Sequence, residues 1–126
     1  MSKKTLLIAA MSAALASSAT LSAADEFRHV VMFKFKPEAT ADKVEEIEKA
    51  FAELPKKITS IKAYEWGKSE SVEGLNDGFT HCFLVTFKDK ADLEAYLPSE
   101  AHKAFVEKLK PLLDKALVFD YKAKTD

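Results

Sequence analysis

Two segments of this chain alternate like β-strands and are nevertheless apolar on both faces, which constrains the fold more than any other feature of the sequence. They read FRHVVMFKFK at residues 27–36 and FTHCFLVTF at residues 79–87. One face of the pair holds His29, Val31, Phe33, His81, Phe83 and Val85. The opposite face is also apolar in the middle, at Val30, Met32 and Leu84. Strands of this kind are covered on both sides, so their sheet needs two covering layers.

The other segments supply helices and outer strands. Three signals indicate the helices. Thr40 and Ser99 can cap their first turns, apolar residues recur at helical spacing, and Pro55 and Pro111 mark their ends. The expected elements are a helix at 40–54, a strand at 58–69, a polar turn at 70–78, a short helix at 89–97, a helix from Glu100 and a strand at 116–122.

This order, β-α-β-β-α-β, is the ferredoxin-like plan of an α+β domain. A chain of 126 residues has room for one such domain and not for two cores. Helices can cover one face of the sheet, and we expect the other face to carry Val31, Phe33, Phe83 and Val85. An exposed apolar face marks an interface. The sequence therefore predicts a homodimer, a dimeric alpha-beta barrel in which two sheets pack face to face.

Residues 1–24 differ from the rest of the chain. Lys3 and Lys4 precede an uncharged run, TLLIAAMSAALASSAT, and small residues close the segment before charge resumes at Asp25. These are the regions of a secretory signal peptide cleaved after Ala24. The run is nominally long enough to span a bilayer, but its Ala and Ser content favours a signal. We therefore expect an exported protein, periplasmic or extracellular, whose mature domain at 25–126 has no contact with a membrane.

Composition argues against several functions. The 19 Lys and Arg against 20 Asp and Glu give a formal net charge of -1, which disfavours nucleic-acid binding through a basic surface. The single cysteine, Cys82, rules out an intrachain disulfide and a multi-cysteine zinc site. The sequence contains neither GxxxxGK[ST] nor GxGxxG, the phosphate-binding motifs. We expect no cofactor.

Three histidines are the candidates for chemistry. His29 and His81 share a strand face, and both project inward if that face lines the interior. A histidine that titrates near neutral pH can act as a general base while a Tyr hydroxyl holds an enolate oxygen. The same residues can equally be partly buried histidines that are hydrogen-bonded to backbone or hydroxyl groups. His102 follows the Ser99 cap, where the positive helix end favours a neutral imidazole, and it fits either a base or a local structural role.

The three histidines could instead bind a metal, but they are far apart in the sequence and no local ligand motif joins them. Cys82 alternates opposite to His81 and is interpreted as a small packed residue. We therefore expect no metal site.

The mature chain resembles one known family over nearly all of its length. The segments FRHVVMFKFKPEAT, YEWGKS, GFTHCFLVTF, AYLPSEAHKAF and LVFDYKA are similar to those of the stress-responsive A/B barrel, or Dabb, domain family. Members are dimeric alpha-beta barrels, and most have no assigned reaction. The resemblance implies the same fold and assembly, and a role in stress response by family alone.

An enzymatic member of that family, a plant polyketide cyclase, suggests roles for single residues. Its catalytic pair for an intramolecular aldol condensation is a Tyr followed six residues later by a His, and Tyr96 and His102 match that pair. Its strand histidines match His29 and His81. The turn after Tyr96 lacks the cyclase's His-Pro, and Leu113 replaces an aromatic residue, so the pocket should differ in shape.

One leading hypothesis and two alternatives follow. The leading one is an exported homodimer that holds a small apolar or aromatic molecule between the sheet and the second helix. The residues expected to bind that molecule are His29, Val31, Phe33, His81, Phe83 and Phe105. The first alternative is a cofactor-independent, cyclase-like enzyme that uses His102 with Tyr96, and the second is a non-catalytic structural or assembly module. A haem- or flavin-linked monooxygenase is less favoured, because no cofactor signature is present.

Overall fold

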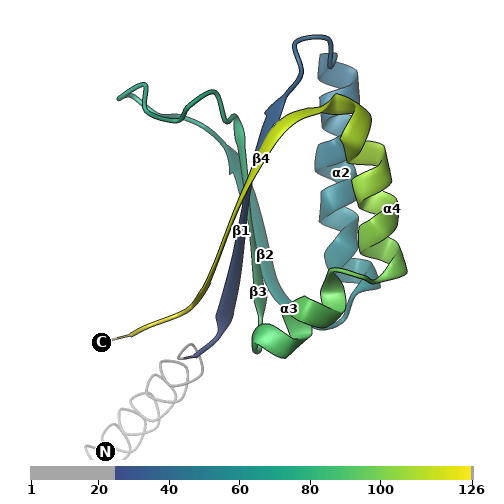
Figure 1. Ribbon diagram of the computed structural model, residues 1–126, viewed down its shortest axis with the longest axis vertical. Helices are drawn as coiled ribbons and strands as arrows, with labels where there is room; N and C mark the ends of the chain where they lie inside the picture. The colour runs from purple at the N-terminus through teal and green to yellow at the C-terminus, as the bar shows by residue number, and fades with distance from the viewer. Residues whose placement is uncertain (1–24, 126) are drawn as a thin grey trace, which may run out of the picture.

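The computed structural model describes residues 25–125, in which a four-stranded antiparallel sheet carries helices on one face (Figure 1). The strands, in sheet order, are β2 (Ile61–Lys68), β3 (His81–Phe87), β1 (Phe27–Phe35) and β4 (Leu113–Lys122). The helices are α2 (Ala41–Lys57), α3 (Lys90–Tyr96), α4 (Glu100–Leu109) and the 3₁₀ helix η1 (Lys110–Leu112). The ferredoxin-like plan is confirmed, with its second helical unit divided in two. The signal peptide predicted at 1–24 lies outside the described residues.

Side-chain caps begin the three α-helices of residues 25–125. Thr40 Oγ1 accepts the backbone N–H of Lys43 at 3.3 Å, and Asp89 and Ser99 act in the same way at α3 and α4. Each cap satisfies an N–H group that has no partner within its own helix. No helix of residues 25–125 is both long and apolar enough to cross a membrane.

The predicted end of α2 at Leu54 is wrong, because the helix continues through Pro55 to Lys57. Pro55 removes only its own hydrogen bond to the carbonyl four residues earlier. The N–H of Ile58 still closes the last turn on the Leu54 carbonyl at 2.9 Å. β1 begins at Phe27 as expected, whereas β2, β3 and β4 begin two or three residues away from their expected first residues, because sequence patterns are least precise at the ends of elements.

The antiparallel register sorts strand residues into transverse rows, since directly paired residues project from the same face. On the helix-covered face, we call these the His81 row (Lys68, His81, Phe33, Ala116), the Trp66 row (Trp66, Phe83, Val31, Val118) and the His29 row (Tyr64, Val85, His29, Asp120). The uncovered face carries three rows as well. The first is Gly67, Cys82, Met32 and Leu117; the second is Glu65, Leu84, Val30 and Phe119; and the third is Ala63, Thr86, Arg28 and Tyr121.

The core lies between the sheet and the helices α2 and α4. Its centre is a cluster of aromatic rings, in which Phe51 stacks on Phe83 at 4.2 Å and meets Phe105 at 4.9 Å between ring centroids. The expected orientation of the sheet is therefore wrong. The side chains predicted for the open face are instead buried beneath the helices, namely Val31, Phe33, Phe83 and Val85.

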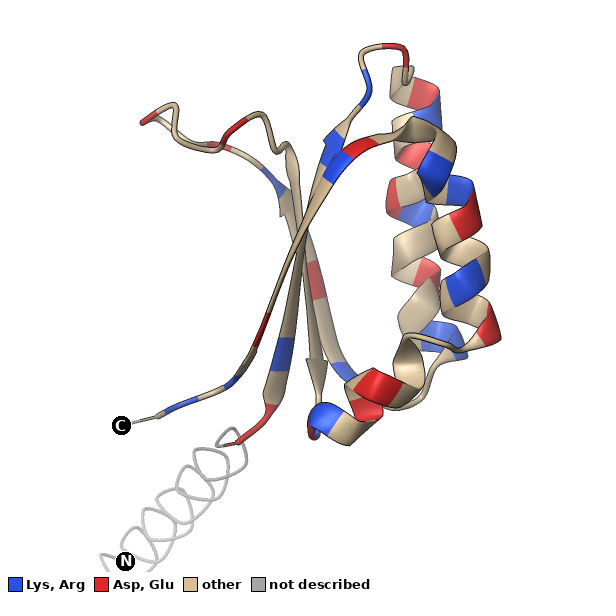
Figure 2. Ribbon diagram, in the orientation of Figure 1, with Lys and Arg blue, Asp and Glu red and all other residues tan. Residues whose placement is uncertain are grey.

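The opposite face of the sheet is the uncovered one, and it is also apolar. Phe119 is 62% exposed there, and Leu117 and Tyr121 are exposed on the same strand. Cys82 lies on this face and is half-buried, not inside the core of the protomer. Charged residues are frequent instead along α2 and α4 (Figure 2). The apolar surface that the sequence predicts is thus present, on the other side of the sheet.

Candidate functional site

Two separate groups of polar side chains lie on the helix-covered face of the sheet. One is built on the His81 row and the other on the His29 row, and the apolar Trp66 row lies between them. Rows on one face are about 7 Å apart, so roughly 13 Å separates the two histidine rows. The structure buries both histidines beneath the helices, on the face that the sequence predicts to be open, and they do not share a site.

His29 is held between the edge strand β4 and helix α3. Its Nδ1 lies 2.6 Å from Asp120 Oδ1, and its ring meets the ring of Tyr96 edge-on at 6.0 Å between centroids. Only 5% of His29 is exposed, whereas Asp120 remains about one-third exposed. Because the carboxylate accepts, Nδ1 carries the proton, and Nε2 is left as the acceptor in the neutral ring.

The turn between α3 and α4 brings Tyr96 and His102 together. Ser99 Oγ donates to the Tyr96 carbonyl at 2.7 Å and accepts the backbone N–H of His102 at 3.3 Å. Pro98 precedes this cap, and its missing N–H and fixed φ suit the tight turn. The rings of Tyr96 and His102, the pair that the family resemblance suggests, therefore lie 4.5 Å apart between centroids.

His102 is fixed in one tautomer by its local contacts. Its Nδ1 lies 2.8 Å from the carbonyl oxygen of Leu97, which can only accept, so Nδ1 carries the proton. The described residues offer no hydrogen bond to Nε2. Burial lowers the pKa of His102, as does the nearby His29, while the Leu97 carbonyl opposes this shift in part. The ring is therefore neutral at pH 7, with Nε2 free to accept a proton.

Tyr96 supplies a neutral hydroxyl on a ring that lies next to the ring of His102. Burial raises the pKa of Tyr96 above its ordinary value, and so does the neighbouring Tyr64. The side-chain hydrogen bonds of residues 25–125 include none to the Tyr96 hydroxyl, although only 2% of the residue is exposed. A protonated phenol next to an unprotonated imidazole can donate to a ligand oxygen while the imidazole accepts a proton.

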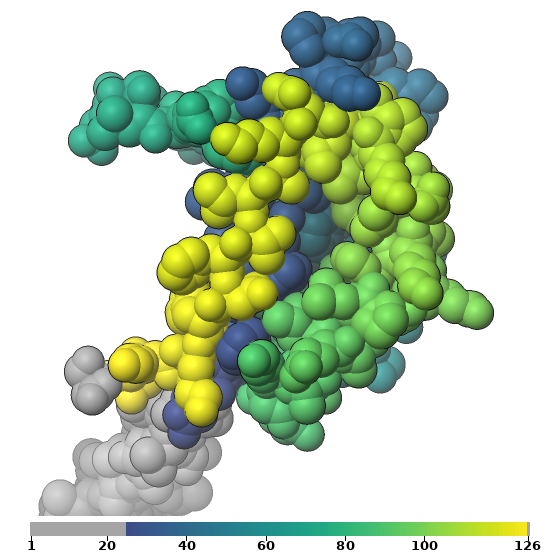
Figure 3. Space-filling view, in the orientation of Figure 1, coloured from purple at the N-terminus to yellow at the C-terminus, as the bar shows by residue number. Residues whose placement is uncertain are grey.

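A recess opens between β4 and the helices. In Figure 3, atoms of β1 are visible between β4 and the green helices. Val118 projects toward the helices yet is 54% exposed, because no helix covers this edge strand. The recess is therefore bounded by the elements that carry Asp120, His29, Tyr96 and His102.

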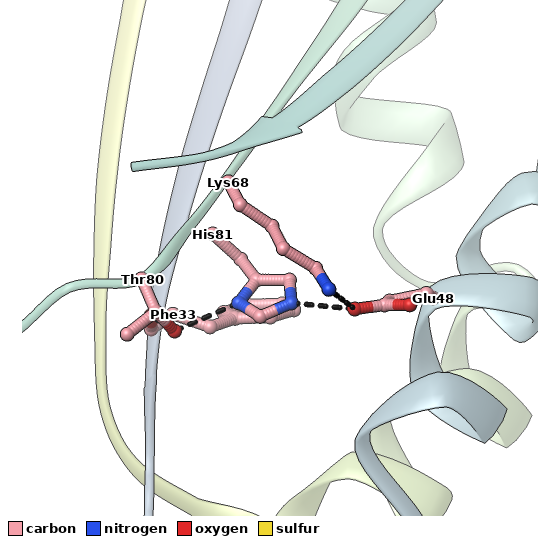
Figure 4. A network of polar contacts seen from close by, with 5 residues as sticks. All are labelled: Phe33, Glu48, Lys68, Thr80 and His81. Carbon is pink, nitrogen blue, oxygen red and sulfur yellow. Dashed lines mark hydrogen bonds and ion pairs between the residues drawn. The ribbon is translucent and has the colours of Figure 1, made fainter. Parts of the chain in front are cut away.

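His81 belongs to a closed network at the other end of the sheet (Figure 4). Its Nε2 lies 2.7 Å from Glu48 Oε2 and its Nδ1 lies 2.7 Å from Thr80 Oγ1. Lys68 Nζ approaches the same Glu48 oxygen at 3.7 Å, and Trp66 stacks parallel to the imidazole at 6.0 Å. Both ring nitrogens are occupied, so His81 has no free lone pair for a ligand.

The other residues predicted to bind a ligand fall into two groups. Phe33, Phe83 and Phe105 belong to the aromatic cluster of the core, where they contact one another. Val31 lies in the Trp66 row, next to Val118 at the edge of the recess. Among residues 25–125, no three His, Cys, Asp or Glu side chains are grouped so as to hold a metal ion.

Sequence reasoning missed Asp120 and Glu48, the acidic partners of the two buried histidines. Neither belongs to a motif: Glu48 lies in the charged stretch of α2, and Asp120 lies between Phe119 and Tyr121 of β4. The signal that could have found Asp120 is its place opposite His29 once the last strand is paired with the first.

Comparison with known proteins assigns the described domain. The model of the stress responsive A/B barrel domain matches residues 27–123. The stress-response A/B barrel domain-containing protein HS1 of Arabidopsis thaliana is 40% identical over 95 residues, which are 75% of this chain and 87% of that protein. Olivetolic acid cyclase of Cannabis sativa is 32% identical over 94 residues, which are 75% of this chain and 93% of the cyclase.

Solved structures agree with the fold. A hydroxynitrile lyase from Passiflora edulis superposes with a TM-score of 0.76 at 25% identity, over 81% of this chain and 96% of the lyase. A dimeric ferredoxin-like protein of unknown function from Thermobifida fusca superposes with a TM-score of 0.69 at 21% identity, over 79% of this chain and 92% of that one. The second likeness bears on the fold alone.

Proposed function

The chain belongs to the stress-responsive A/B barrel domain family, and from that premise we propose that it is a homodimer that binds a small apolar or aromatic molecule in the recess beside His29, Tyr96 and His102. One observation carries the proposal: Tyr96 and His102 present an unpaired hydroxyl and an unpaired nitrogen next to each other at the edge of an aromatic core. Neither atom is among the buried unpaired atoms of residues 25–125, so both can be reached from outside, where a ligand can pair with them.

Mass spectrometry of the native protein under non-denaturing conditions, after isolation from its own cells, tests binding and assembly together. We expect a mass of two processed chains plus a small organic molecule, which is released by denaturation. His102→Gln and Tyr96→Phe should reduce the retained ligand. Ala104→Lys, on the exposed side of α4, is the control and should retain it. A dimer that never carries a ligand would support the non-catalytic assembly module instead.

The uncovered face of the sheet supports the homodimer. Leu84, Val30 and Phe119 form an apolar row across its middle, and a second copy of the same face would complement it. The Thermobifida fusca relative is described as dimeric, which agrees with this assembly. Burying this face in a sheet-on-sheet contact would supply the second layer that the strands need.

A charge at the centre of that face tests the assembly. Leu84→Lys should give monomers in sedimentation experiments, because an unpaired ammonium group would be buried in the interface. The Ala104→Lys control should remain dimeric. If Leu84→Lys still sediments as a dimer, the interface lies elsewhere on the protomer.

A catalytic role is the second candidate, and the fixed tautomer of His102 favours it. His102 Nε2 would remove a proton next to a carbonyl, and the Tyr96 hydroxyl would hold the resulting enolate oxygen, without a cofactor. The names of the Cannabis sativa cyclase and the Passiflora edulis lyase agree with an enzymatic use of this fold.

Catalysis is tested with a linear poly-β-keto thioester as the substrate, and mass spectrometry measures the aromatic products. We expect cyclisation faster than in buffer, and a loss of at least about 100-fold in His102→Gln. Products that form at the same rate in buffer and in the presence of the enzyme would remove this candidate and leave ligand binding intact.

Export and a role in stress response complete the proposal. The pattern of residues 1–24 supports export, and the family name supports the stress role. The native protein should begin at Asp25, and its abundance should change under stress. A native chain that retains Met1 would contradict export without affecting the site.

A further inference from the structure

The loop between β2 and β3 leaves the sheet on the side away from the helices (Figure 1). It comprises residues 69–80, and we call it the arm. Two of its side chains, Val72 and Leu75, are apolar and exposed, at 98% and 78% respectively, and we call them the apolar tip. The arm therefore stands out over the uncovered face of the sheet and presents apolar side chains there.

Contacts at its base hold the arm in this position. The side-chain amide of Asn76 donates to the Phe79 carbonyl at 2.8 Å, and the backbone N–H of Phe79 donates to the Asn76 carbonyl at 2.9 Å. Lys115 Nζ of β4 lies 3.7 Å from Asp77 Oδ2. Because the base is already ordered, a partner that meets the arm loses little affinity to the ordering of this loop.

A hollow of about 510 Å³ lies between the arm and the sheet. One end of the uncovered face contributes Met32, Cys82 and Leu117 to its lining, and the arm contributes Leu75 and Phe79. The apolar tip is therefore continuous with the face that we propose as the dimer interface. A second copy that packs on this face would close the hollow and meet the arm.

Charge indicates which end of the second copy lies against the arm. The arm carries three acidic side chains and no Lys or Arg. Two arms placed side by side would bring these like charges together, which costs free energy. At the opposite end of the uncovered face, Arg28 and Lys62 share one carboxylate, that of Glu26, and leave a positive charge in excess. That end is the electrostatic complement of the arm.

We propose that the arm clasps a second copy of this chain, with its apolar tip packed against the end of that copy's uncovered face that carries Arg28. This inference rests on the proposed homodimer and gives its orientation: the strands of the two sheets run in opposite directions, and symmetry repeats the contact at both ends. The reach is sufficient, because packed sheets are about 10 Å apart and each side of the arm, about six residues, can span up to roughly 20 Å.

The contribution of the arm to assembly is measured by sedimentation of the mature protein over a dilution series. We expect Leu75→Ser to raise the dissociation constant of the dimer at least about 10-fold, because one apolar contact is lost in each copy. Leu97→Ser removes another exposed leucine, in the turn between α3 and α4, and serves as the control. It should keep the wild-type constant.

Chemical cross-linking tests the orientation. In a Cys82→Ser background, Leu75→Cys combined with Tyr121→Cys should give a covalent dimer with a short bismaleimide. The two positions belong to opposite ends of one sheet, so they meet only between copies. Each single variant should stay unlinked, because equivalent positions lie at opposite ends of the proposed dimer. A covalent dimer from Leu75→Cys alone would show that the two arms meet and would overturn the proposed orientation.

Failure of the clasp can be distinguished from failure of the homodimer. If Leu84→Lys gives monomers while Leu75→Ser keeps the wild-type dissociation constant, the dimer stands and the arm does not clasp it. If the wild type sediments as a monomer at every concentration, both proposals fail.

Discussion

The two buried histidines of this domain are about equally exposed to solvent, but they differ in how many of their ring nitrogens are hydrogen-bonded. His81 uses both ring nitrogens, on Glu48 and Thr80, and Trp66 covers its ring. His29 uses one nitrogen on Asp120, and its neighbours Tyr96 and His102 each retain an unpaired polar atom. Burial therefore does not identify the functional histidine. The functional histidine is the one whose neighbours retain polar atoms that have no partner within residues 25–125 and that a ligand can reach.

The cause of this difference lies in what covers each row. The His81 row lies under α2, which contributes Glu48 at short range. The His29 row ends at the edge strand β4, which no helix covers, and its polar groups therefore face the recess. One end of the sheet is a closed structural network, and the other is open to a ligand.

The largest expected effect concerns the closed network. Glu48→Leu or His81→Phe should each cost about 3 kcal/mol in the free energy of unfolding, because each leaves the other partner buried and unpaired. The double variant should cost clearly less than the sum of the two, since it removes both polar partners. Urea denaturation measures all three. Strict additivity would show that the two side chains do not depend on each other.

The second largest effect on stability concerns the turn that joins α3 to α4, which positions Tyr96 and His102. Ser99→Ala removes the N-cap of α4 and the donor to the Tyr96 carbonyl, and we expect a loss of about 1–2 kcal/mol. Ser99→Asp restores a cap acceptor without the hydroxyl donor and should recover most of that stability. Ligand retention in Ser99→Asp then reports whether the Tyr96 contact matters for the site. Equal stability of Ser99→Ala and the wild type would contradict the capping role.

His29→Phe should cost less than His81→Phe, about 1 kcal/mol, because Asp120 is partly exposed and can return to water. The same urea experiment compares the two variants directly. Equal losses of stability would mean that the His29–Asp120 contact is as well shielded from water as the His81–Glu48 contact. The two ends of the sheet would then not differ as described.

The smallest expected effect is a pH dependence of stability from His102. Its folded pKa lies below 6.5, so the unfolded chain binds the proton more readily. Stability from this group is full above pH 6.5 and decreases as the pH falls from 6.5 through the folded pKa. Nuclear magnetic resonance titration should place the His102 midpoint below 6.5, and His102→Gln should flatten the slope in that window. A midpoint above 6.5 would mean that His102 is charged at the pH where it is proposed to act as a base.

The sequence by itself determined the element order, the caps and the paired spacing of Tyr96 and His102. These are local properties, because a cap acts within three residues and a turn of six residues can bring two rings together without help from the rest of the fold. The family resemblance rests on the same local segments, and the comparisons confirm it.

Only the tertiary structure decided which face of the sheet is inside and which histidine keeps a free nitrogen. Alternation separates Val31 and Phe83 from Val30 and Leu84, but both sets are apolar, so hydrophobicity could not say which set the helices cover. Asp120 and Tyr64 reach the His29 row only through the pairing of four strands. Contacts between residues far apart in the chain depend on register and packing, which no local pattern encodes.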